Sequence, residues 1–384
     1  MSKMGKMNGA IKHPDRRPVR VGIIGAGNVL WAYLRALDRL IPAGLASLVS
    51  VCARRRERWD ELGSRRPGIH LVAEPDETLR SDADLIVIIT PPENHAGLVR
   101  RALENGKSVL VEKPLAATRA EGEELAELAD QRGLHLIAAP FVHLAPTFRA
   151  FWEEIQNGAI GRPHSARGLY GNAGSTWAAW YHQGKVGPLA EVGVYNLKSL
   201  TALLGPAVEV LAAEHTAINT RLIGDCEITA PGHDVSHVIL RHESGALSNV
   251  VSSHAIQRYR RPALEIYGSE GTANLLGDDW DPRGFEIWRN KSGCWEEYEP
   301  VEGTWMWTDG LTEVVTAMFH GRGPLAEITH DLHLLEVIEA ARSSAKEGRW
   351  TPIASRFREL DLRLKEHRRD LHHLHDHTRP ADEQ

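Results

Sequence analysis

Val109-Leu110-Val111-Glu112-Lys113-Pro114 joins an apolar, largely β-branched run to a carboxylate, an amine and a proline. The apolar run predicts a buried strand, and proline both fixes its own φ and holds the preceding residue in an extended conformation. Lys113 is therefore expected at the end of that strand. In an open α/β sheet, ligands bind along the edge formed by the carboxyl ends of the strands. We expect the Lys113 amine to project into such a site; the alternative is a surface amine that merely follows a strand.

A strand, a glycine turn and a helix lie upstream of this stretch. Residues 20–25 predict a short apolar strand that runs into Gly25-Ala26-Gly27-Asn28, and the apolar residues that follow have the spacing of an amphipathic helix. In a dinucleotide site the first glycine allows a tight turn, and the second lets the backbone approach the pyrophosphate at the helix N-terminus. Gly25, Gly27 and Asn28 are therefore candidate cofactor residues. Leu30 occupies the third glycine position, so an ordinary strand–turn–helix unit remains the alternative.

The end of the next predicted strand, residues 48–53, bears on the choice between NAD and NADP. NAD-binding units usually end this strand with Asp or Glu, which bonds the ribose 2′-hydroxyl. Here Ala53 is followed by Arg54, Arg55 and Arg56. Because a guanidinium binds phosphate through a planar fork, Arg54 suits a 2′-phosphate, and we expect NADP in preference to NAD. The alternative is that the arginines only begin a solvated helix over residues 54–62.

Strands and helices continue to alternate up to position 140. Further strands are predicted at 85–90, 108–112 and 134–138, and helices at 96–105 and 118–132. This alternation predicts an α/β Rossmann domain, that is, a doubly wound parallel sheet. We place this dinucleotide-binding domain at residues 19–140 and expect residues 1–18 to be a disordered lead-in.

After position 140 the pattern changes to that of an α+β domain with a large, mostly antiparallel open sheet, residues 141–355. Helices are predicted at 146–157, 189–204 and 330–346, strands at 235–242, 246–254, 263–267, 272–276 and 285–290, and a loop-rich segment at 158–188. Residues 356–384 form a charged, His-rich tail.

Composition excludes several classes of partner. The net charge of −6 provides no basic field for nucleic acid. Three cysteines without a Cys-x-x-Cys motif suit a reducing compartment. No apolar run reaches the ~18–20 residues that a membrane helix needs, and the first residues lack the apolar core of a secretory signal. We therefore expect a cytoplasmic protein with neither a membrane nor a nucleic-acid partner.

The tail is dense in residues that ligate metals: His367, His372, His373, His375, Asp376 and His377. An ordered metal site needs fixed geometry and supporting residues around its ligands. The flanking sequence predicts neither, so we expect a solvated tail and no metal.

Taken together, these motifs resemble those of the Gfo/Idh/MocA oxidoreductase family, founded on glucose-fructose oxidoreductase and inositol dehydrogenase. The resemblance covers residues 19–345. It is carried by the Gly25-Ala26-Gly27 turn, Thr90-Pro91-Pro92 with His95 beyond it, Glu112-Lys113-Pro114 and the segment 187–205. It implies hydride transfer between NAD(P) and a hydroxyl carbon of a sugar, cyclitol or related polyol. It also implies a homo-oligomer, a dimer or tetramer, formed through the C-terminal sheet, and cofactor contacts from Thr90, Pro91, His95, Glu112 and Lys113.

Two positions depart from the pattern of inositol dehydrogenase-like members, which carry Asp and, four residues later, His. This chain has Glu191 and Tyr195. Tyrosine at the second position is known from glucose-fructose oxidoreductase- and dihydrodiol dehydrogenase-like members, so the resemblance implies Lys113, Tyr195 and Glu191 as catalytic residues. A phenol in water has a pKa of about 10, which a neighbouring ammonium lowers, so Tyr195 assisted by Lys113 suits acid–base chemistry. One helical turn separates Glu191 from Tyr195, and Glu191 is expected to orient Lys113 or bind a substrate hydroxyl. The alternative for Tyr195 is an amphipathic-helix residue at the rim.

Three aromatic residues, Trp177, Trp180 and Tyr181, are candidates for stacking on the apolar face of a sugar, and interdomain packing is the alternative. Two other functions remain open. One is a catalytically silent nucleotide sensor or scaffold on the same fold. The other is redox-assisted elimination or hydrolysis on a sugar, in which a proton is removed beside a transient ketone.

Overall fold

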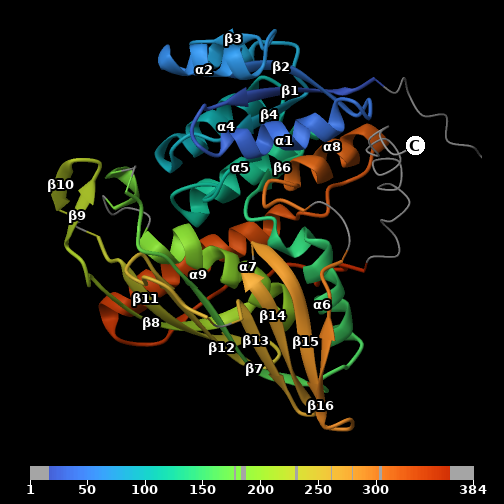
Figure 1. Ribbon diagram of the computed structural model, residues 1–384, viewed down its shortest axis with the longest axis vertical. Coiled ribbons are helices and arrows are strands. Elements are labelled where there is room, and N and C mark those ends of the chain that lie inside the picture. The colour runs from blue at the N-terminus through green and yellow to red at the C-terminus, as the bar shows by residue number, and fades with distance from the viewer. Residues whose placement is uncertain are drawn as a thin grey trace, which may run out of the picture.

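The computed structural model describes residues 17–176, 179–182, 187–229, 232–260, 262–278, 280–301 and 305–363. A helix-covered sheet lies at the top of Figure 1 and a broad sheet at the bottom, with helices between the two. The expected lead-in up to residue 16 and the tail from residue 364, with its histidines, lie outside the described residues.

The N-terminal sheet has six parallel strands within the described residues, in the order β3-β2-β1-β4-β5-β6. Its strands are β1 (Val19–Ile24), β2 (Ala46–Cys52), β3 (Leu71–Val72), β4 (Leu85–Ile88), β5 (Ser108–Val111) and β6 (Leu136–Ala138), and its helices are α1 (Leu30–Leu40), α2 (Glu57–Arg65), α3 (Pro75–Leu79), α4 (His95–Glu104) and α5 (Arg119–Gln131). Separate apolar clusters cover the two faces. The order reverses between β1 and β4, which is where doubly wound sheets bind ligands. The predicted Rossmann fold is confirmed.

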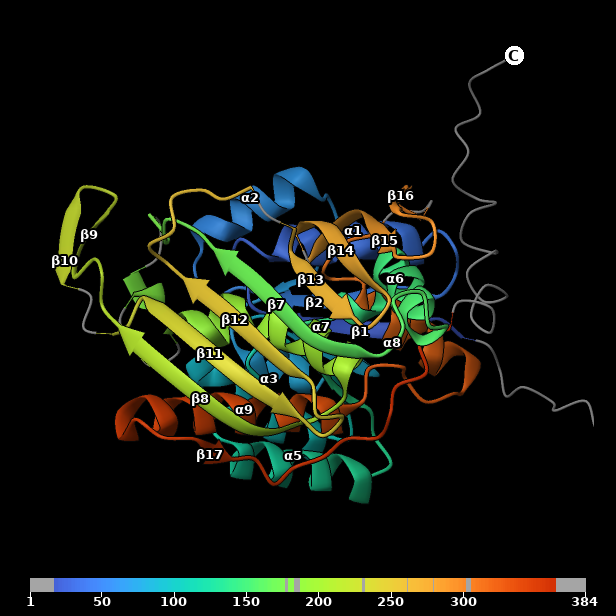
Figure 2. The same cartoon turned by 90° about the horizontal axis from the view of Figure 1, so that it is seen from below.

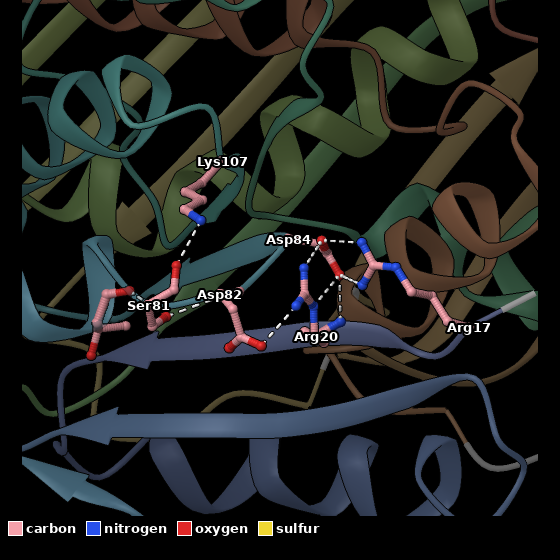
Figure 3. A network of polar contacts seen from close by, with 8 residues as sticks. Arg17, Arg20, Ser81, Asp82, Asp84 and Lys107 are labelled. Carbon is pink, nitrogen blue, oxygen red and sulfur yellow. Dashed lines mark hydrogen bonds and ion pairs between the residues drawn. The ribbon is translucent and has the colours of Figure 1, made fainter. Parts of the chain in front are cut away.

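The amino end of β1 is fixed by the polar network in Figure 3. Arg17 and Arg20 both donate to the Asp84 carboxylate, at 2.8 and 3.0 Å, and Lys107 donates to the Ser81 carbonyl at 2.8 Å. Burial alone raises the pKa of Asp84, but the hydrogen bonds from the two guanidinium groups outweigh it and hold that pKa well below its usual range. The network ties β1 to the loop before β4, the strand on the other side of the ligand-binding reversal.

The C-terminal sheet has nine strands within the described residues, in the order β16-β15-β14-β13-β7-β12-β11-β8-β17. The strands are β7 (Pro163–Gly171), β8 (Ala207–His215), β11 (Val235–His242), β12 (Leu247–Ser253), β13 (Leu264–Gly268), β14 (Gly271–Asp278), β15 (Asp281–Arg289), β16 (Cys294–Tyr298) and β17 (Thr351–Pro352). Adjacent strands are antiparallel except β7 and β12. A separate hairpin, β9 (Thr220–Ile223) and β10 (Cys226–Thr229), projects from the side of the molecule in Figures 1 and 2.

Three helices pack on one face of this sheet: α6 (Pro146–Gln156), α7 (Val194–Leu204) and α9 (Ile328–Glu347). They share one apolar cluster with the inward-facing strand residues. In Figure 2, α9 lies between the sheet and α5 of the N-terminal domain. The predicted α+β domain with a mostly antiparallel sheet is confirmed.

Strand β7 corrects the sequence prediction, which made residues 158–188 loop-rich. Its sequence, PHSARGLYG, lacks the apolar alternation of a half-buried strand because α7 approaches it closely. At Gly168 a Cβ would lie 2.8 Å from the Cβ of Asn196, so only a glycine fits there. The strand is therefore held by its neighbours β12 and β13 and has no pattern of its own to predict it.

Helix α8 (Gly310–His320) was not predicted, although its apolar residues have helical spacing. Leu311, Val314 and Val315 join the apolar cluster of the N-terminal sheet, so this C-terminal element completes the first domain's core. The predicted start of the tail at 356 is also too early, because Leu360 and Leu362 are buried in the second domain's core. Within the described residues, no helix is long and apolar enough to cross a bilayer.

Candidate active site

Lys113 leaves the carboxyl end of β5 and reaches the second domain. Its Nζ donates to Glu191 Oε2 at 2.5 Å, and the two side chains are only 15% and 3% exposed. Glu191 lies in a π-helical turn, Leu189–Gly193, which runs directly into α7. The structure therefore brings together two of the predicted catalytic residues, one from each domain, in a nearly water-free contact.

The two carboxylates nearest Lys113 determine its charge. Burial alone lowers the pKa of the amine, but the charges of Glu191 and Glu112 outweigh burial and raise that pKa above its usual value. The side chain is therefore an ammonium at neutral pH. Glu191 Oε1, the oxygen that does not receive the Lys113 bond, is buried with no hydrogen-bond partner among the described residues.

Tyr195 stands on the first turn of α7, beside the same ammonium. Lys113 Nζ lies 6.0 Å from the centre of the Tyr195 ring, at the outer limit of a cation–π contact. The Tyr170 ring meets the Tyr195 ring edge-on, with 5.6 Å between their centres. The π turn alters the simple α-helical spacing expected between Glu191 and Tyr195, and turns of this kind are frequent at functional sites.

Glu112 points back into the N-terminal domain. Its Oε1 accepts from the Tyr33 hydroxyl at 2.9 Å and its Oε2 accepts from the Lys113 backbone N–H at 3.2 Å. Both side chains are buried, so the end of β5 is fastened to α1. Tyr33 falls among the apolar positions of the helix expected after the glycine turn, and its hydroxyl on the buried face of α1 was the available signal for this contact.

The glycine turn has room for an anion. Gly25 has φ +120°, and a Cβ there would lie 2.7 Å from the Ile89 carbonyl oxygen, so glycine is required. At Gly27 a Cβ would meet nothing within 4 Å among the described atoms. No described side chain caps the start of α1, although the Leu30 and Ala32 N–H groups donate to the backbone carbonyls of Gly27 and Val29 at 3.2 and 3.1 Å. An open turn before an uncapped helix fits a pyrophosphate, and Gly25, Gly27 and Asn28 would hold it.

Arg58 binds the backbone of the glycine turn. Its guanidinium donates to the carbonyls of Ala26 at 2.8 Å and Gly27 at 3.3 Å. Sequence reasoning missed Arg58 because its contacts lie about thirty residues upstream.

The three consecutive arginines precede α2 instead of starting it, since α2 begins at Glu57. The Arg56 guanidinium stacks over the Trp59 ring at 4.2 Å. Arg54 and Arg55 are exposed, and Arg54 follows directly after Ala53 at the end of β2. Arg54 thus follows the end of β2, where NAD-binding units usually carry an acidic residue.

The residues after β4 occupy two different environments. Thr90 Oγ1 is buried without a partner among the described residues. The His95 ring is fully buried, with Nε2 2.8 Å from the Thr90 carbonyl and Nδ1 2.7 Å from the Pro114 carbonyl. His95 therefore links the segments that follow β4 and β5. Thr90 and Pro91 lie on the segment after β4, at the ligand-binding edge of the sheet.

Of the three aromatic candidates, Tyr181 is the one whose side chain can be placed. Its hydroxyl accepts from Asn172 Nδ2 at 3.4 Å, and its ring centre lies 4.3 Å from that of His254. Trp177 and the side chain of Trp180 lie outside the described residues. Among the residues that the structure does describe, no group of three or more His, Cys, Asp or Glu is arranged to hold a metal ion.

Two family models match the chain, one for each of its two domains. A family model described as an oxidoreductase family with an NAD-binding Rossmann fold matches residues 19–139, and the GFO/IDH/MocA C-terminal domain matches residues 148–274. A dTDP-3,4-didehydro-2,6-dideoxy-alpha-D-glucose 3-reductase of Actinomadura kijaniata is 31% identical over 202 residues, 52% of this chain and 60% of that protein. A D-apiose dehydrogenase of Paraburkholderia graminis is 24% identical over 327 residues, 81% of this chain and 84% of that protein.

Among solved structures, levoglucosan dehydrogenase in complex with NADH superimposes with a TM-score of 0.79 at 19% identity, over 88% of this chain and all of that chain. This likeness concerns the fold. The two family models together cover well over half of the sequence, in the order in which the two domains occur. The chain therefore belongs to the GFO/IDH/MocA oxidoreductase family.

Proposed function

We propose that this protein is an NADP-preferring dehydrogenase or reductase that moves a hydride between the nicotinamide and a hydroxyl-bearing carbon of a sugar, cyclitol or related polyol. One observation supports this most strongly: the Lys113 ammonium lies 2.5 Å from the Glu191 carboxylate and 6.0 Å from the centre of the Tyr195 ring, where the carboxyl end of β5 meets α7. The relatives named for D-apiose and for a deoxyglucose derivative support a sugar as substrate.

The nicotinamide, when bound, accepts or returns the hydride, and the protein positions the substrate and moves the proton. Because the pKa of Lys113 is raised, this residue stays protonated and acts as a hydrogen-bond donor to the reacting oxygen. Tyr195 then exchanges the hydroxyl proton, stabilised as phenolate by the ammonium beside its ring. Glu191 holds Lys113 through Oε2, which leaves Oε1 to accept a bond from the substrate.

We infer the preference for NADP from the residues at the end of β2. Ala53 offers no carboxylate to a ribose 2′-hydroxyl, and the exposed Arg54 follows it directly. Arg56 stacks on Trp59, and Arg58 binds the carbonyls of the glycine turn. Of the exposed Arg54 and Arg55, Arg54 is the one next to the end of β2, which favours it for a 2′-phosphate.

We also propose a homo-oligomer, a dimer or tetramer, formed through the face of the C-terminal sheet opposite its helices. Ile239 on β11 and Leu247 on β12 are 40% and 42% exposed, although each is large and apolar. Light scattering coupled to size-exclusion chromatography would detect the assembly. A monomer at micromolar concentration would contradict it.

Purified protein, NADP⁺, NAD⁺ and a panel of sugars and cyclitols test the main proposal. We expect tighter binding of NADP⁺ by calorimetry and formation of reduced nicotinamide, followed by absorbance, with at least one polyol. Absence of cofactor binding would overturn the proposal. Cofactor binding without turnover would favour a silent sensor, and a dehydrated or hydrolysed product without net reduction of cofactor would favour redox-assisted elimination or hydrolysis.

A further inference from the structure

His254, directly after β12, is a buried histidine that the mechanism above does not use. Its side chain is 2% exposed, and Nε2 is buried without a hydrogen-bond partner among the described residues. His242 on β11 is the natural comparison, because it is equally buried but bonds the Gly205 carbonyl and Ser248 Oγ, both at 2.7 Å. Leaving a buried polar atom unpaired is costly, so we expect the Nε2 of His254 to bind a partner that the described residues do not supply.

The position of His254 beside the active site follows from the packing of β12 against the π turn. A Cβ at Gly193 would lie 2.8 Å from Ser252 Oγ, so the turn that carries Glu191 rests on the strand two residues before His254. Tyr181 lies on the other side of the ring, with its ring centre 4.3 Å away.

Both rings lie within electrostatic range of the catalytic pair. Burial raises the pKa of Tyr181, and the charges of Glu191 and Lys113 act on it in opposite directions. Lys113 also contributes to lowering the pKa of His254. Tyr181 and His254, which we call the wall, thus pack against each other within electrostatic range of the Lys113–Glu191 pair.

Asp234 makes this wall rigid. Its carboxylate accepts from the N–H groups of Ala217 and Ile218 and from the Arg221 guanidinium, at 2.6, 3.0 and 2.6 Å. Its carbonyl accepts from the His254 N–H at 2.8 Å. The backbone of His254 is therefore fixed before any ligand binds, which is the preorganisation that a selective polar contact needs.

The protonation state of His254 limits what it can bind. Burial, together with the charges of His182, Arg221 and Lys113, lowers its pKa to about 3. The ring is therefore neutral at physiological pH, and its unpaired Nε2 is either a donor or an acceptor, according to the tautomer. A hydroxyl group both donates and accepts, so it can pair with Nε2 in either tautomer, whereas a carboxylate can only accept.

We propose that His254 binds a second hydroxyl of the polyol, next to the one that is oxidised, so that the site selects vicinal diols. This inference rests on the proposed function and adds a specificity determinant to it. The oxidised hydroxyl lies at Lys113 and Tyr195, and its neighbour lies between His254 and the unpaired Oε1 of Glu191.

His254→Phe and His254→Gln test this with the polyol that the panel identifies and with its deoxy analogue lacking the neighbouring hydroxyl. For His254→Phe we expect kcat/KM to fall about tenfold for the diol and to stay unchanged for the deoxy analogue. His254→Gln keeps a donor and an acceptor, so it should retain more of the preference. His242→Phe is the matched control: it should lower stability toward urea without changing the ratio of diol to deoxy rates.

An equal effect of His254→Phe on both compounds would overturn the inference while the proposed function stands. If His254→Phe fails to fold, an unchanged diol preference in a folded His254→Ala variant would overturn it equally. Absence of turnover by the wild-type protein with every polyol would instead overturn the proposed function, and this inference with it.

Discussion

Glu191→Gln removes one charge from the Lys113–Glu191 pair while keeping the shape of the side chain. The pair is joined at 2.5 Å and both partners are largely excluded from water. Removing one partner of a buried ion pair leaves the other charge uncompensated, at a cost of about 3–5 kcal/mol. We therefore expect Glu191→Gln to lower the free energy of unfolding by about 3 kcal/mol at neutral pH, the lower end of that range, because Lys113 retains some contact with solvent.

The same substitution changes how stability depends on pH. In the wild-type protein the pKa of Lys113 is raised above its value of about 10.4 in the unfolded chain. Its contribution to folding stability is therefore fully present below the unfolded pKa and is lost as the pH rises through the folded pKa. Burial is the largest influence on Lys113 and acts in the opposite direction, and without Glu191 only Glu112 opposes it among the nearby carboxylates that raise this pKa. In the variant the pKa of Lys113 should therefore fall, and the destabilisation should diminish as the pH is raised from 7 toward 10.

Urea unfolding at several pH values measures both effects. The matched control is Glu209→Gln, which breaks a pair with Arg241 whose side chains are 42% and 47% exposed and should cost less than about 1 kcal/mol. A loss in Glu191→Gln no greater than in Glu209→Gln, with no change in its pH dependence, would refute this reading of the Lys113 environment.

Three further substitutions test other parts of the structure. Arg54→Ala should raise the Kd for NADP⁺ about tenfold in calorimetry and leave that for NAD⁺ nearly unchanged, because only a 2′-phosphate uses the guanidinium; equal weakening would contradict the NADP preference. Lys198→Met should lower the free energy of unfolding, measured with urea, by about 3–5 kcal/mol. The Lys198 ammonium donates to the buried Asp331 carboxylate at 2.6 Å, and the substitution leaves that carboxylate without its cation. Adding Asp331→Leu should recover much of that loss, and a double variant no more stable than the single one would contradict the pairing. Asp84→Asn should lower the free energy of unfolding by about 1 kcal/mol at pH 7 and by little at pH ~2. The pKa of Asp84 is lower in the folded than in the unfolded protein, so this carboxylate stabilises the fold fully above its unfolded pKa, and its contribution is lost as the pH falls. A loss of stability that does not depend on pH would contradict this.

The features that sequence predicted well are those encoded within a few consecutive residues. The buried runs before Gly25 and Lys113 have the composition of parallel strands, and each ends in a residue type that marks the ligand edge. A contact of Glu191 with Lys113 was one of the two roles that the family resemblance suggested for Glu191, and the structure shows this contact. The π turn that carries Glu191 was not expected. Nothing in a four-residue spacing distinguishes a π turn from an α-helical one.

The features that sequence missed depend on partners far along the chain. Tyr33 acquires its role from a carboxylate 79 residues away, and β7 is defined by the strands on either side of it. His254 looked like any other residue of a predicted strand, and only the packing of β12 against the π turn brings it to the site. Such roles arise from tertiary contacts, which local periodicity does not encode.

Turnover by Tyr195→Phe, measured beside Lys113→Ala, tests the central claim most directly. Both variants should bind NADP⁺ in calorimetry, Tyr195→Phe with wild-type affinity. Each should lose activity toward the identified polyol by a factor of ~10²–10⁴, as expected when the acid–base group or its electrostatic partner is removed. Wild-type kcat in Tyr195→Phe, with cofactor affinity intact, would contradict the assignment of this phenol as the proton-exchanging group.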